Sequence, residues 1–263
     1  MNETSGERLY AAASDGVRAR TDVIEFFPEI DSTNSYLLKQ AAPGNGRCRI
    51  ALANHQTAGR GQRGNTWESP QDAGLYLSCA YTFPERPKQF SCLTLAIGVE
   101  LAEALTDLGA TCKLKWPNDL ILHNGKLGGV LTETYAGKEN AATIVVGIGI
   151  NLDLGERRDS ISSSIGRVSD LRQAIPELPE REEIARPIIE STVAALTNFA
   201  ANGFSGFHER WSEFDWLANK AVQVATSNGT MDGVASGIDE DGAFLLLRND
   251  KVERIISGSV TLL

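Results

Sequence analysis

Residues 59–64 form a segment rich in glycine and arginine, with the sequence GRGQRG. Its glycines let the backbone approach a ligand closely. The guanidinium groups of Arg60 and Arg63 offer forked donors that suit a phosphate or a carboxylate. The spacing fits neither the dinucleotide-binding pattern nor the P-loop pattern. Taken alone, the segment indicates either an anion-binding loop or a flexible surface loop with solvated arginines.

A pair of lysines lies around a tight turn further along the chain. The first belongs to KWPND at 115–119 and the second to GKLGG at 125–129. Asn124-Gly125 between apolar runs predicts a hairpin, whose facing strands would bring Lys115 near Lys126. Because like charges repel at such distances, an anion between the two ammonium groups would be favourable. The alternative is a hairpin with solvated lysines, which is the usual state of this residue.

The other two motifs mark the ends of expected elements. GIGIN at 147–151 predicts a strand that ends in an amide. Its glycines either admit a ligand or simply pack, with Asn151 starting a turn. DSTN at 31–34 precedes a helical run and predicts an N-cap, whose hydroxyl groups could also bind an uncharged polar ligand.

An alternation of strand and helix patterns positions these motifs. Period-2 and β-branched patterns predict strands at 23–27, 49–54, 75–83, 120–122, 127–134 and 143–151. Helical spacing of apolar residues predicts helices at 90–108, 181–200 and 206–216. We expect residues 1–20 to form a loose or weakly helical arm, and the polar stretch 152–178 to form a mobile loop.

After residue 219 the pattern changes to short strand-like runs separated by turn residues. These runs lie at 222–225, 233–238, 243–247 and 253–256. Regular strands with turn residues between them predict a small β-barrel of about 45 residues.

Composition narrows the classes of protein. The chain has 263 residues, 42% of them hydrophobic, and a net charge of −9, which argues against a general nucleic-acid binder. The four cysteines form no CxxC pair and the three histidines no helical pair, so a structural zinc site is not expected. The N-terminus lacks a signal-peptide pattern, and no apolar run is long enough to span a membrane. These features predict a soluble, cytoplasmic protein with reduced thiols.

Taken together and in order, the motifs resemble the biotin protein ligases. The resemblance rests on DSTN at 31–34, QTAGRGQRGNTW at 56–67, KWPND at 115–119, GKLGG at 125–129 and GIGIN at 147–151, and it covers nearly the whole chain. It implies an α+β fold: a class II synthetase-like catalytic domain on a mixed β-sheet at 1–217, then an SH3-like barrel at 218–263.

The resemblance also implies the reaction. Such ligases use ATP and Mg²⁺ to convert biotin to biotinoyl-5′-AMP, and they transfer the biotinoyl group to one lysine of a biotin carboxyl carrier domain. No direct protein ligand to a metal is expected. Only about twenty residues precede the first predicted strand, so we expect the ligase-only type, without DNA or membrane partners, as a monomer or a homodimer.

Site residues follow from the resemblance position by position. Lys126, Arg60 and Asp119 take the catalytic roles, with Asp119 orienting the acceptor amine or accepting its proton. The biotin-binding set is Ser32, Thr33, Asn34, Gln56, Arg60, Gly61, Gln62, Lys126, Gly128 and Gly129. The ATP and adenylate set is Arg60, Gln62, Arg63, Trp67, Lys115, Asn118, Lys126 and Asn151. Residues 59–64 are expected to fold over biotin, and residues 152–170 to close on the adenine side.

One departure concerns the glycine-rich segment. The repressor-type pattern usually reads GRGRRG, whereas this chain has the uncharged Gln62 at the fourth position, and Asn65 stands where many members have a basic residue. The arginine there helps to retain the adenylate, so we expect Arg60, Arg63 and Lys126 to carry more of that task here.

Two other functions compete with this interpretation. A lipoate-protein ligase would use the same adenylation chemistry, but the polar set Ser32, Thr33 and Gln56 suits the ureido ring of biotin. A non-catalytic biotin sensor that regulates transcription would need a DNA-binding arm, which the short N-terminus and the charge of −9 do not favour.

Overall fold

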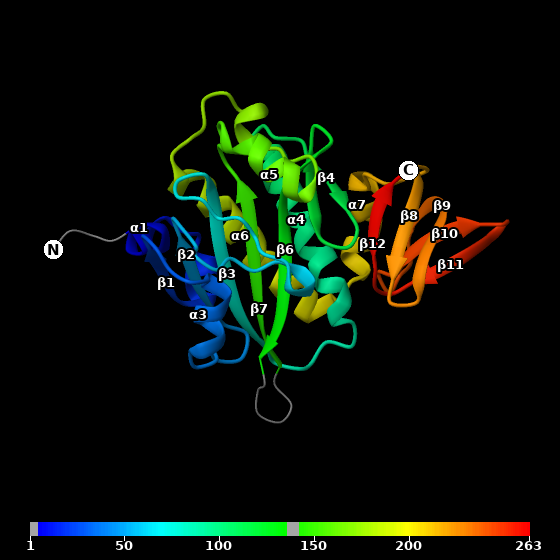
Figure 1. The fold of residues 1–263 in the computed structure, drawn as a ribbon. Coiled ribbons are helices and arrows are strands. Elements are labelled where there is room, and N and C mark those ends of the chain that lie inside the picture. The colour runs from blue at the N-terminus through cyan, green and yellow to red at the C-terminus, as the bar shows by residue number, and fades with distance from the viewer. Residues whose placement is uncertain (1–4, 136–141) are drawn as a thin grey trace.

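The computed structural model describes residues 5–135 and 142–263 and contains two β-sheets (Figure 1). Within those residues, the larger sheet has the order β1-β2-β3-β7-β6-β5-β4, and the C-terminal sheet the order β11-β10-β9-β8-β12. The strands of the larger sheet are β1 (Thr21–Phe27), β2 (Cys48–Ala53), β3 (Gly74–Phe83), β4 (Lys113–Lys115), β5 (Asp119–Leu122), β6 (Gly125–Tyr135) and β7 (Ala142–Asn151).

The helices pack on both faces of the larger sheet. They are α1 (Ser5–Ala12), α2 (Asp15–Arg20), α3 (Thr33–Lys39), α4 (Leu93–Asp107), α5 (Arg157–Ile165), α6 (Arg181–Asn202) and α7 (Ser205–Phe214), with short 3₁₀ turns η1 (Gln62–Gly64), η2 (Phe90–Cys92) and η3 (Leu171–Gln173). Among the described helices, none is long and apolar enough to cross a membrane.

The larger sheet is mixed, as expected for the α+β class. Strand β1 runs parallel to β2, whereas β2, β3, β7, β6, β5 and β4 pair antiparallel along the sheet. The predicted hairpin at Asn124-Gly125 is confirmed, since β5 and β6 pair across it.

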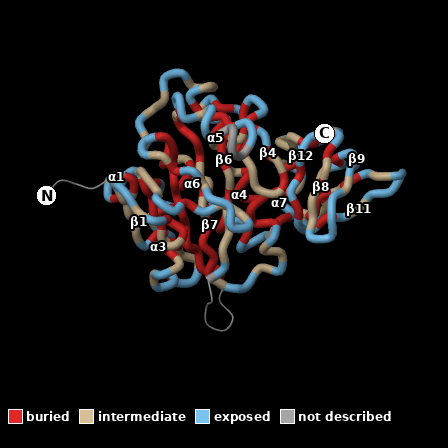
Figure 2. The backbone as a smooth tube through the Cα atoms, in the orientation of Figure 1, coloured by how far each residue is buried: buried red, intermediate tan, exposed pale blue. Residues whose placement is uncertain are grey.

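The two faces of the larger sheet differ in side-chain size, because alternate residues of a strand point to opposite faces. On one face, residues such as Leu77 and Ile148 join the main core with α4 and α6. On the other, Ala51, Ala80 and Val145 pack against Leu37 of α3. Figure 2 shows this buried interior running through the central strands. Helix α3 is short, so much of the second face is left for the site described below.

Two segments are more ordered than the sequence predicted. Residues 5–20 belong to an arm expected to be loose or weakly helical, and they form the helices α1 and α2, in which Leu9 and Val17 are buried and Arg8 pairs with Glu182 of α6 at 2.6 Å. The stretch 152–178, expected as a mobile loop, contains α5 and η3. Local polarity hid the long-range partners that order both segments.

The C-terminal sheet contains β8 (Ala221–Thr226), β9 (Gly229–Ile238), β10 (Phe244–Arg248), β11 (Lys251–Ile255) and β12 (Ser259–Leu262), all antiparallel. Four of these strands were expected, and β12 was missed, since it is short and only Val260 in it is buried. In Figure 1 this sheet lies beside α7, with β12 on the side that faces the larger sheet. A separate all-β C-terminal unit was expected and is confirmed.

Candidate active site

The predicted motifs meet around a cavity of about 770 Å³ on the face of the larger sheet that α3 only partly covers. Most predicted site residues line it: Ser32, Thr33, Asn34, Gln56, Arg60, Gly61, Gln62, Arg63, Trp67, Lys115, Asn118, Asp119, Lys126 and Gly129. They come from four separate segments of the chain, which only the fold brings together.

Gly128 and Asn151 do not line the cavity. A Cβ on Gly128 would lie 2.5 Å from the carbonyl oxygen of Gly149, so this glycine allows β6 and β7 to pair closely. The side chain of Asn151 is buried and donates to the carbonyl oxygens of Ser169, at 2.9 Å, and Lys126, at 3.3 Å. Its position indicates that Asn151 holds the backbone behind the cavity.

One end of the cavity is uncharged and rich in hydrogen-bonding groups. Ser32 caps α3 as predicted, with its hydroxyl accepting from the backbone N–H of Ser35. Thr33 donates from N and Oγ1 to Oε1 of Gln56 at 3.0 and 3.1 Å, and its hydroxyl lies 2.7 Å from that of Ser78. Gln56 in turn donates to Ser69 at 2.9 Å. This network presents fixed donors and acceptors to a polar, uncharged ring.

Asp31 stands next to this network and has a lowered pKa. The backbone N–H of Ser32 donates to its carboxylate at 2.7 Å, and the ammonium of Lys39 lies 3.3 Å away. Both contacts favour the charged form over the opposing effect of burial. A charged carboxylate therefore lies at the start of α3, just outside the uncharged end of the cavity.

The glycine-rich segment follows a defined path along the cavity. Gly61 donates to the carbonyl oxygen of Asn65 at 2.7 Å, and Arg60 bridges to Thr66, so residues 60–66 fold back on themselves. A Cβ on Gly59 would lie 2.4 Å from the carbonyl oxygen of Trp67, which requires glycine there. The sequence prediction that this segment closes over biotin concerns a bound state and stays a prediction.

Arg60 is held by a residue that the sequence analysis did not select. Its guanidinium lies 2.7 Å from Oε1 of Glu133 on β6, whose Oε2 accepts from the amide of Asn34 at 2.8 Å. Asn34 also accepts from the hydroxyl of Ser78. Glu133 thus connects the glycine-rich segment to the uncharged end of the cavity.

A carboxylate lies between the two lysines of the hairpin. Oδ1 of Asp119 is 2.7 Å from Nζ of Lys126, and its Oδ2 is 3.8 Å from Nζ of Lys115. An anion between these ammonium groups was one of the two alternatives that the sequence left open, and in this structure the protein itself supplies one. An entering carboxylate or phosphate would compete with Asp119 for the same lysines.

The glycines of β7 make room for two side chains. A Cβ on Gly147 would lie 2.4 Å from Oδ1 of Asn34, and a Cβ on Gly149 would lie 2.6 Å from the indole of Trp67. The ammonium of Lys126 lies 5.4 Å from the centre of the Trp67 indole, within the range of a cation–π contact. The flat indole therefore forms part of the cavity between β7 and Lys126.

The segment after α5 returns to Lys126 on β6. Lys126 N donates to the carbonyl oxygen of Arg167, and Ser169 N donates to that of Lys126, both at 2.9 Å. Asp170 anchors this return, since its buried carboxylate accepts from Arg158 at 2.6 Å. Gly166 and Arg167 consequently line the cavity. The expectation that residues 152–170 close on the adenine side concerns a bound state and stays a prediction.

The cavity is more cationic than the chain as a whole. Arg60, Arg63, Lys115, Lys126 and Arg167 all line it, in a protein of net charge −9. Low-dielectric walls focus such a field and attract small anions. Among the described residues, no group of three or more His, Cys, Asp or Glu side chains converges to hold a metal ion.

Several residues of the cavity wall were not predicted from the sequence. They are Ser78, Arg167, Trp216 and residues 258–262. Glu133, which pairs with Arg60, was not predicted either. Ser78 and Glu133 lie inside strands, where a single polar residue is normally explained by the alternation of buried and exposed side chains. A weak indication was that Ser78 and Ala80 are two residues apart on β3 and therefore share the face away from the main core. Residues 258–262 enter the cavity only because the C-terminal sheet packs beside it.

The sequence and the fold are similar to those of known ligases. The profile described as the biotin/lipoate A/B protein ligase family matches residues 26–151, and that of the biotin protein ligase C-terminal domain matches residues 218–263. Bifunctional ligase/repressor BirA of Escherichia coli is 35% identical over 242 residues, covering 91% of this chain and 74% of that protein. The biotin--[acetyl-CoA-carboxylase] ligase of Paracoccus denitrificans is 31% identical and covers 82% of this chain and 90% of its own length. The solved structure of Aquifex aeolicus biotin protein ligase with biotin and ATP has a TM-score of 0.79 and 27% identity, covering 91% of this chain and 97% of that one.

Proposed function

The chain belongs to the biotin protein ligase family, and from that membership we propose that it activates biotin with ATP and transfers it to a carrier lysine. The activated form is biotinoyl-5′-AMP, and the acceptor is a biotin carboxyl carrier domain. The observation that carries the proposal is the cavity itself, in which an uncharged polar end meets a cationic end at Lys126 and Arg60. Biotin has the same division, with a polar ureido ring at one end and a carboxylate at the other.

In the first step, the carboxylate of biotin attacks the α-phosphate of ATP and pyrophosphate leaves. Two anions must approach one another, so the site needs fixed cations where negative charge develops. Lys126 takes this role, because it can leave Asp119, 2.7 Å away, for the reacting oxygens. Arg60 and Arg63 add charge from the glycine-rich segment, and Trp67 offers its flat face to the adenylate.

In the second step, the amine of the carrier lysine attacks the carbonyl carbon of the mixed anhydride and AMP leaves. The amine must be neutral to act as a nucleophile. Asp119 faces the cavity from the start of β5. Once Lys126 has turned to the phosphate, Oδ1 of Asp119 can orient that amine or accept its proton, while Oδ2 stays near Lys115.

The uncharged end of the cavity favours biotin over lipoate. Thr33, Gln56 and Ser78 are tied together by hydrogen bonds of 2.7–3.1 Å, so their remaining donors and acceptors are fixed in place. A ureido ring can pair with such groups, whereas the dithiolane ring of lipoate would leave them unsatisfied at a free-energy cost. Comparison of biotin with lipoate as the carboxylate substrate tests this directly, and equal turnover would contradict it.

Mg²⁺ enters the proposal as the companion of ATP. Magnesium in nucleotide sites is commonly held by phosphates with few protein carboxylates, and the described cavity residues provide only scattered carboxylates, with Asp119 already bound to lysines. The ion would shield the phosphate charges, while the residues named above bind and orient the reacting groups.

The cellular location, the absence of a DNA partner, the domain boundary and the oligomeric state are also proposals. Four free, buried thiols suit a reducing cytoplasm. A net charge of −9 gives no support to DNA as a partner. We place the division between catalytic and C-terminal domains at 217/218. Whether the chain is a monomer or a homodimer would follow from its mass in solution.

Replacement of Lys126 tests the central assignment. Loss of one donor at a developing charge typically lowers turnover about 100-fold, so we expect Lys126→Ala to lose biotin-dependent pyrophosphate exchange and carrier labelling by at least that factor. Lys251→Ala, an exposed lysine on β11, is the matched control and should match the wild type. Undiminished transfer by Lys126→Ala would refute the site assignment.

A further inference from the structure

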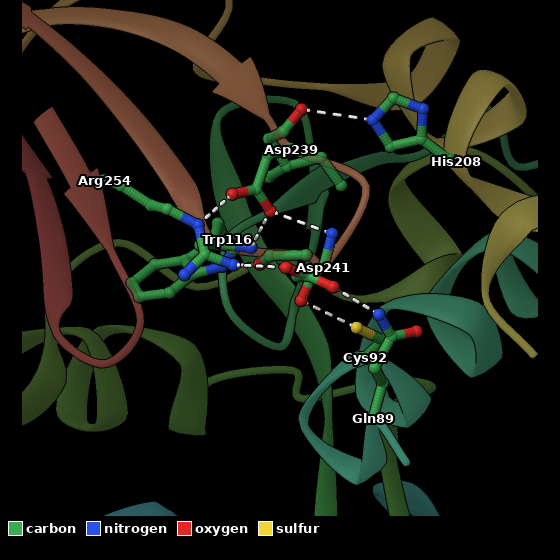
Figure 3. A network of polar contacts seen from close by, with 10 residues as sticks. Gln89, Cys92, Trp116, His208, Asp239, Asp241 and Arg254 are labelled. Atoms are coloured by element: carbon green, nitrogen blue, oxygen red, sulfur yellow. Dashed lines mark hydrogen bonds and ion pairs between the residues drawn. The ribbon is translucent and has the colours of Figure 1, made fainter. Parts of the chain in front are cut away.

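A turn of the C-terminal sheet is built around Asp239. Residues 239–243 join β9 to β10, and Oδ1 of Asp239 accepts the backbone N–H groups of Asp241 and Ala243, both at 2.9 Å. Its Oδ2 accepts from Nε of Arg254 on β11, and the same guanidinium donates to Asp241 at 2.7 Å. Figure 3 shows Arg254 reaching both aspartates from the neighbouring strand. The turn is therefore held by hydrogen bonds of Asp239, and Arg254 ties its two aspartates together.

Residues of the catalytic domain form hydrogen bonds to this turn from the opposite side. Gln89 donates to the Asp241 carboxylate, and the thiol of Cys92 donates to the Asp241 carbonyl oxygen at 2.8 Å. The indole N–H of Trp116 donates to the carbonyl oxygen of Gly242 at 3.1 Å. Gly242 has φ +71, and a Cβ there would lie 2.9 Å from the sulfur of Cys92, so the fit leaves no room for a side chain. These contacts join two parts of the chain that are far apart in sequence (Figure 3).

Trp116 lies between this turn and the candidate active site. Its side chain is 3% exposed and packs on Phe244 of β10, with ring centres 5.4 Å apart. Trp116 and Pro117 line both the active-site cavity and a second cavity of about 150 Å³ whose wall includes Asp241, Gly242 and Arg254. The indole is thus part of the wall that separates the two cavities.

We propose that the 239–243 turn positions the ATP-binding half of the active site, and that it acts through Trp116. The inference rests on the proposed function. Segment 115–119 carries Lys115, Asn118 and Asp119, and it joins the paired strands β4 and β5. Beyond that pairing it has two further anchors. Asn118 exchanges hydrogen bonds of 3.0 Å with Val130 of β6 on one side, and Trp116 binds the turn on the other. Loss of the second anchor lets the Trp116 side of the segment shift while the strand pairing stays intact.

The biotin-binding half has its own support. Thr33, Gln56 and Ser69 are bonded to one another from α3 and the segments that follow β2. A disturbance of the turn should therefore alter the handling of ATP and leave biotin binding almost unchanged. If the contact only held the two domains together, its loss would affect ATP and biotin alike.

The ion pairs of the turn contribute little to stability as such. The side chain of Arg254 is 45% exposed, that of Asp241 56% and that of Asp239 24%, and ion pairs of an arginine this open to water are weak. Their value lies in fixing the direction of the Gly242 carbonyl, which a small change in the turn would point away from the indole. Activity should consequently be more sensitive than stability to the loss of Arg254.

Arg254→Gln is the test variant, and Arg248→Gln is its control. Arg248 lies on β10 of the same sheet and is paired with Glu253 at 3.6 Å, away from the turn. Because a shift of about 1 Å in a positioning group can lower rates by up to about 100-fold, we expect Arg254→Gln to lower kcat/KM for ATP about tenfold in biotin-dependent pyrophosphate exchange. KM for biotin and the melting temperature should stay near wild-type values, and Arg254→Lys should recover part of the loss. The control should match the wild type throughout.

A double-variant cycle tests the route through Trp116. Trp116→Phe keeps an aromatic ring and removes the N–H that reaches Gly242. If the turn acts through this contact, Arg254→Gln should lower kcat/KM for ATP no further in the Trp116→Phe background. Independent, multiplying losses would overturn the proposal, as would equal changes for biotin and ATP that follow a loss of melting temperature. A wild-type chain without pyrophosphate exchange would instead overturn the proposed function.

Discussion

Gly149→Ala should displace Trp67 and separate ATP binding from biotin binding. The added Cβ would lie 2.6–2.8 Å from three atoms of the indole. Since carbon atoms in contact are normally 3.5–4.0 Å apart, the ring must move by about 1 Å. A displacement of that size can cost up to about 100-fold in rate, so we expect a 10- to 100-fold loss of kcat/KM for ATP, equivalent to about 1.4–2.8 kcal/mol.

The fold should tolerate this substitution. Trp67 is only partly buried and lies on the segment after η1, so it can swing away from β7 without disturbing the core. We expect the free energy of unfolding to change by less than about 1 kcal/mol, as for most substitutions outside the core. By contrast, Gly147→Ala would meet the buried Asn34 at 2.4 Å, and it should raise KM for biotin instead.

Both KM values come from pyrophosphate exchange. The ATP concentration is varied at saturating biotin, and the biotin concentration is then varied at saturating ATP. Gly206→Ala in α7 is the control, because a Cβ there meets no atom within 4 Å. If Gly149→Ala leaves kcat/KM for ATP within twofold of the wild type, Trp67 does not form the adenylate surface. Equal effects of Gly147→Ala and Gly149→Ala on both substrates would contradict the division of the cavity.

Three other predictions follow from the site and the turn. Gln62→Arg should slow the release of biotinoyl-5′-AMP, as measured by trapping of free adenylate, because it adds a cation to the cavity wall; unchanged release would show that charge at this position does not retain the intermediate. Asp239 has a pKa below its ordinary value of 3.8, because hydrogen bonds from Arg254 and the backbone outweigh the opposing effect of burial. The stability that the ionised Asp239 provides is complete above that ordinary value and is lost as the pH falls through the lowered pKa. Asp239→Asn should therefore reduce the fall in the free energy of unfolding at acid pH, as measured by urea denaturation at several pH values. An equally steep fall in the variant and the wild type would contradict this. Residues 59–64 should become protected from limited proteolysis when biotin and ATP are both added, since a closed loop excludes water and protease alike; identical cleavage with and without ligands would argue against closure.

The regular elements were largely predictable from local patterns. The apolar spacing that predicted a helix at 90–108 produced α4, and Asn124-Gly125 produced the β5–β6 hairpin. At residues 5–20 and 152–178, which are more ordered than the sequence predicted, part of that order comes from distant partners. Arg8 pairs with Glu182, and the backbone N–H of Ser169 donates to the carbonyl oxygen of Lys126, and neither contact leaves a signal in the local sequence.

The order and types of the motif residues determined the family, the reaction class and most of the cavity lining. Residue type could do so because charged guanidinium and ammonium groups beside glycines suit few tasks other than binding anions. Local sequence did not determine which groups would touch. Asp119 lies between Lys115 and Lys126, Glu133 holds Arg60, and Trp116 binds a carbonyl oxygen 126 residues away. These contacts depend on strand register and on how the C-terminal sheet packs, and both are set by the burial of the whole core.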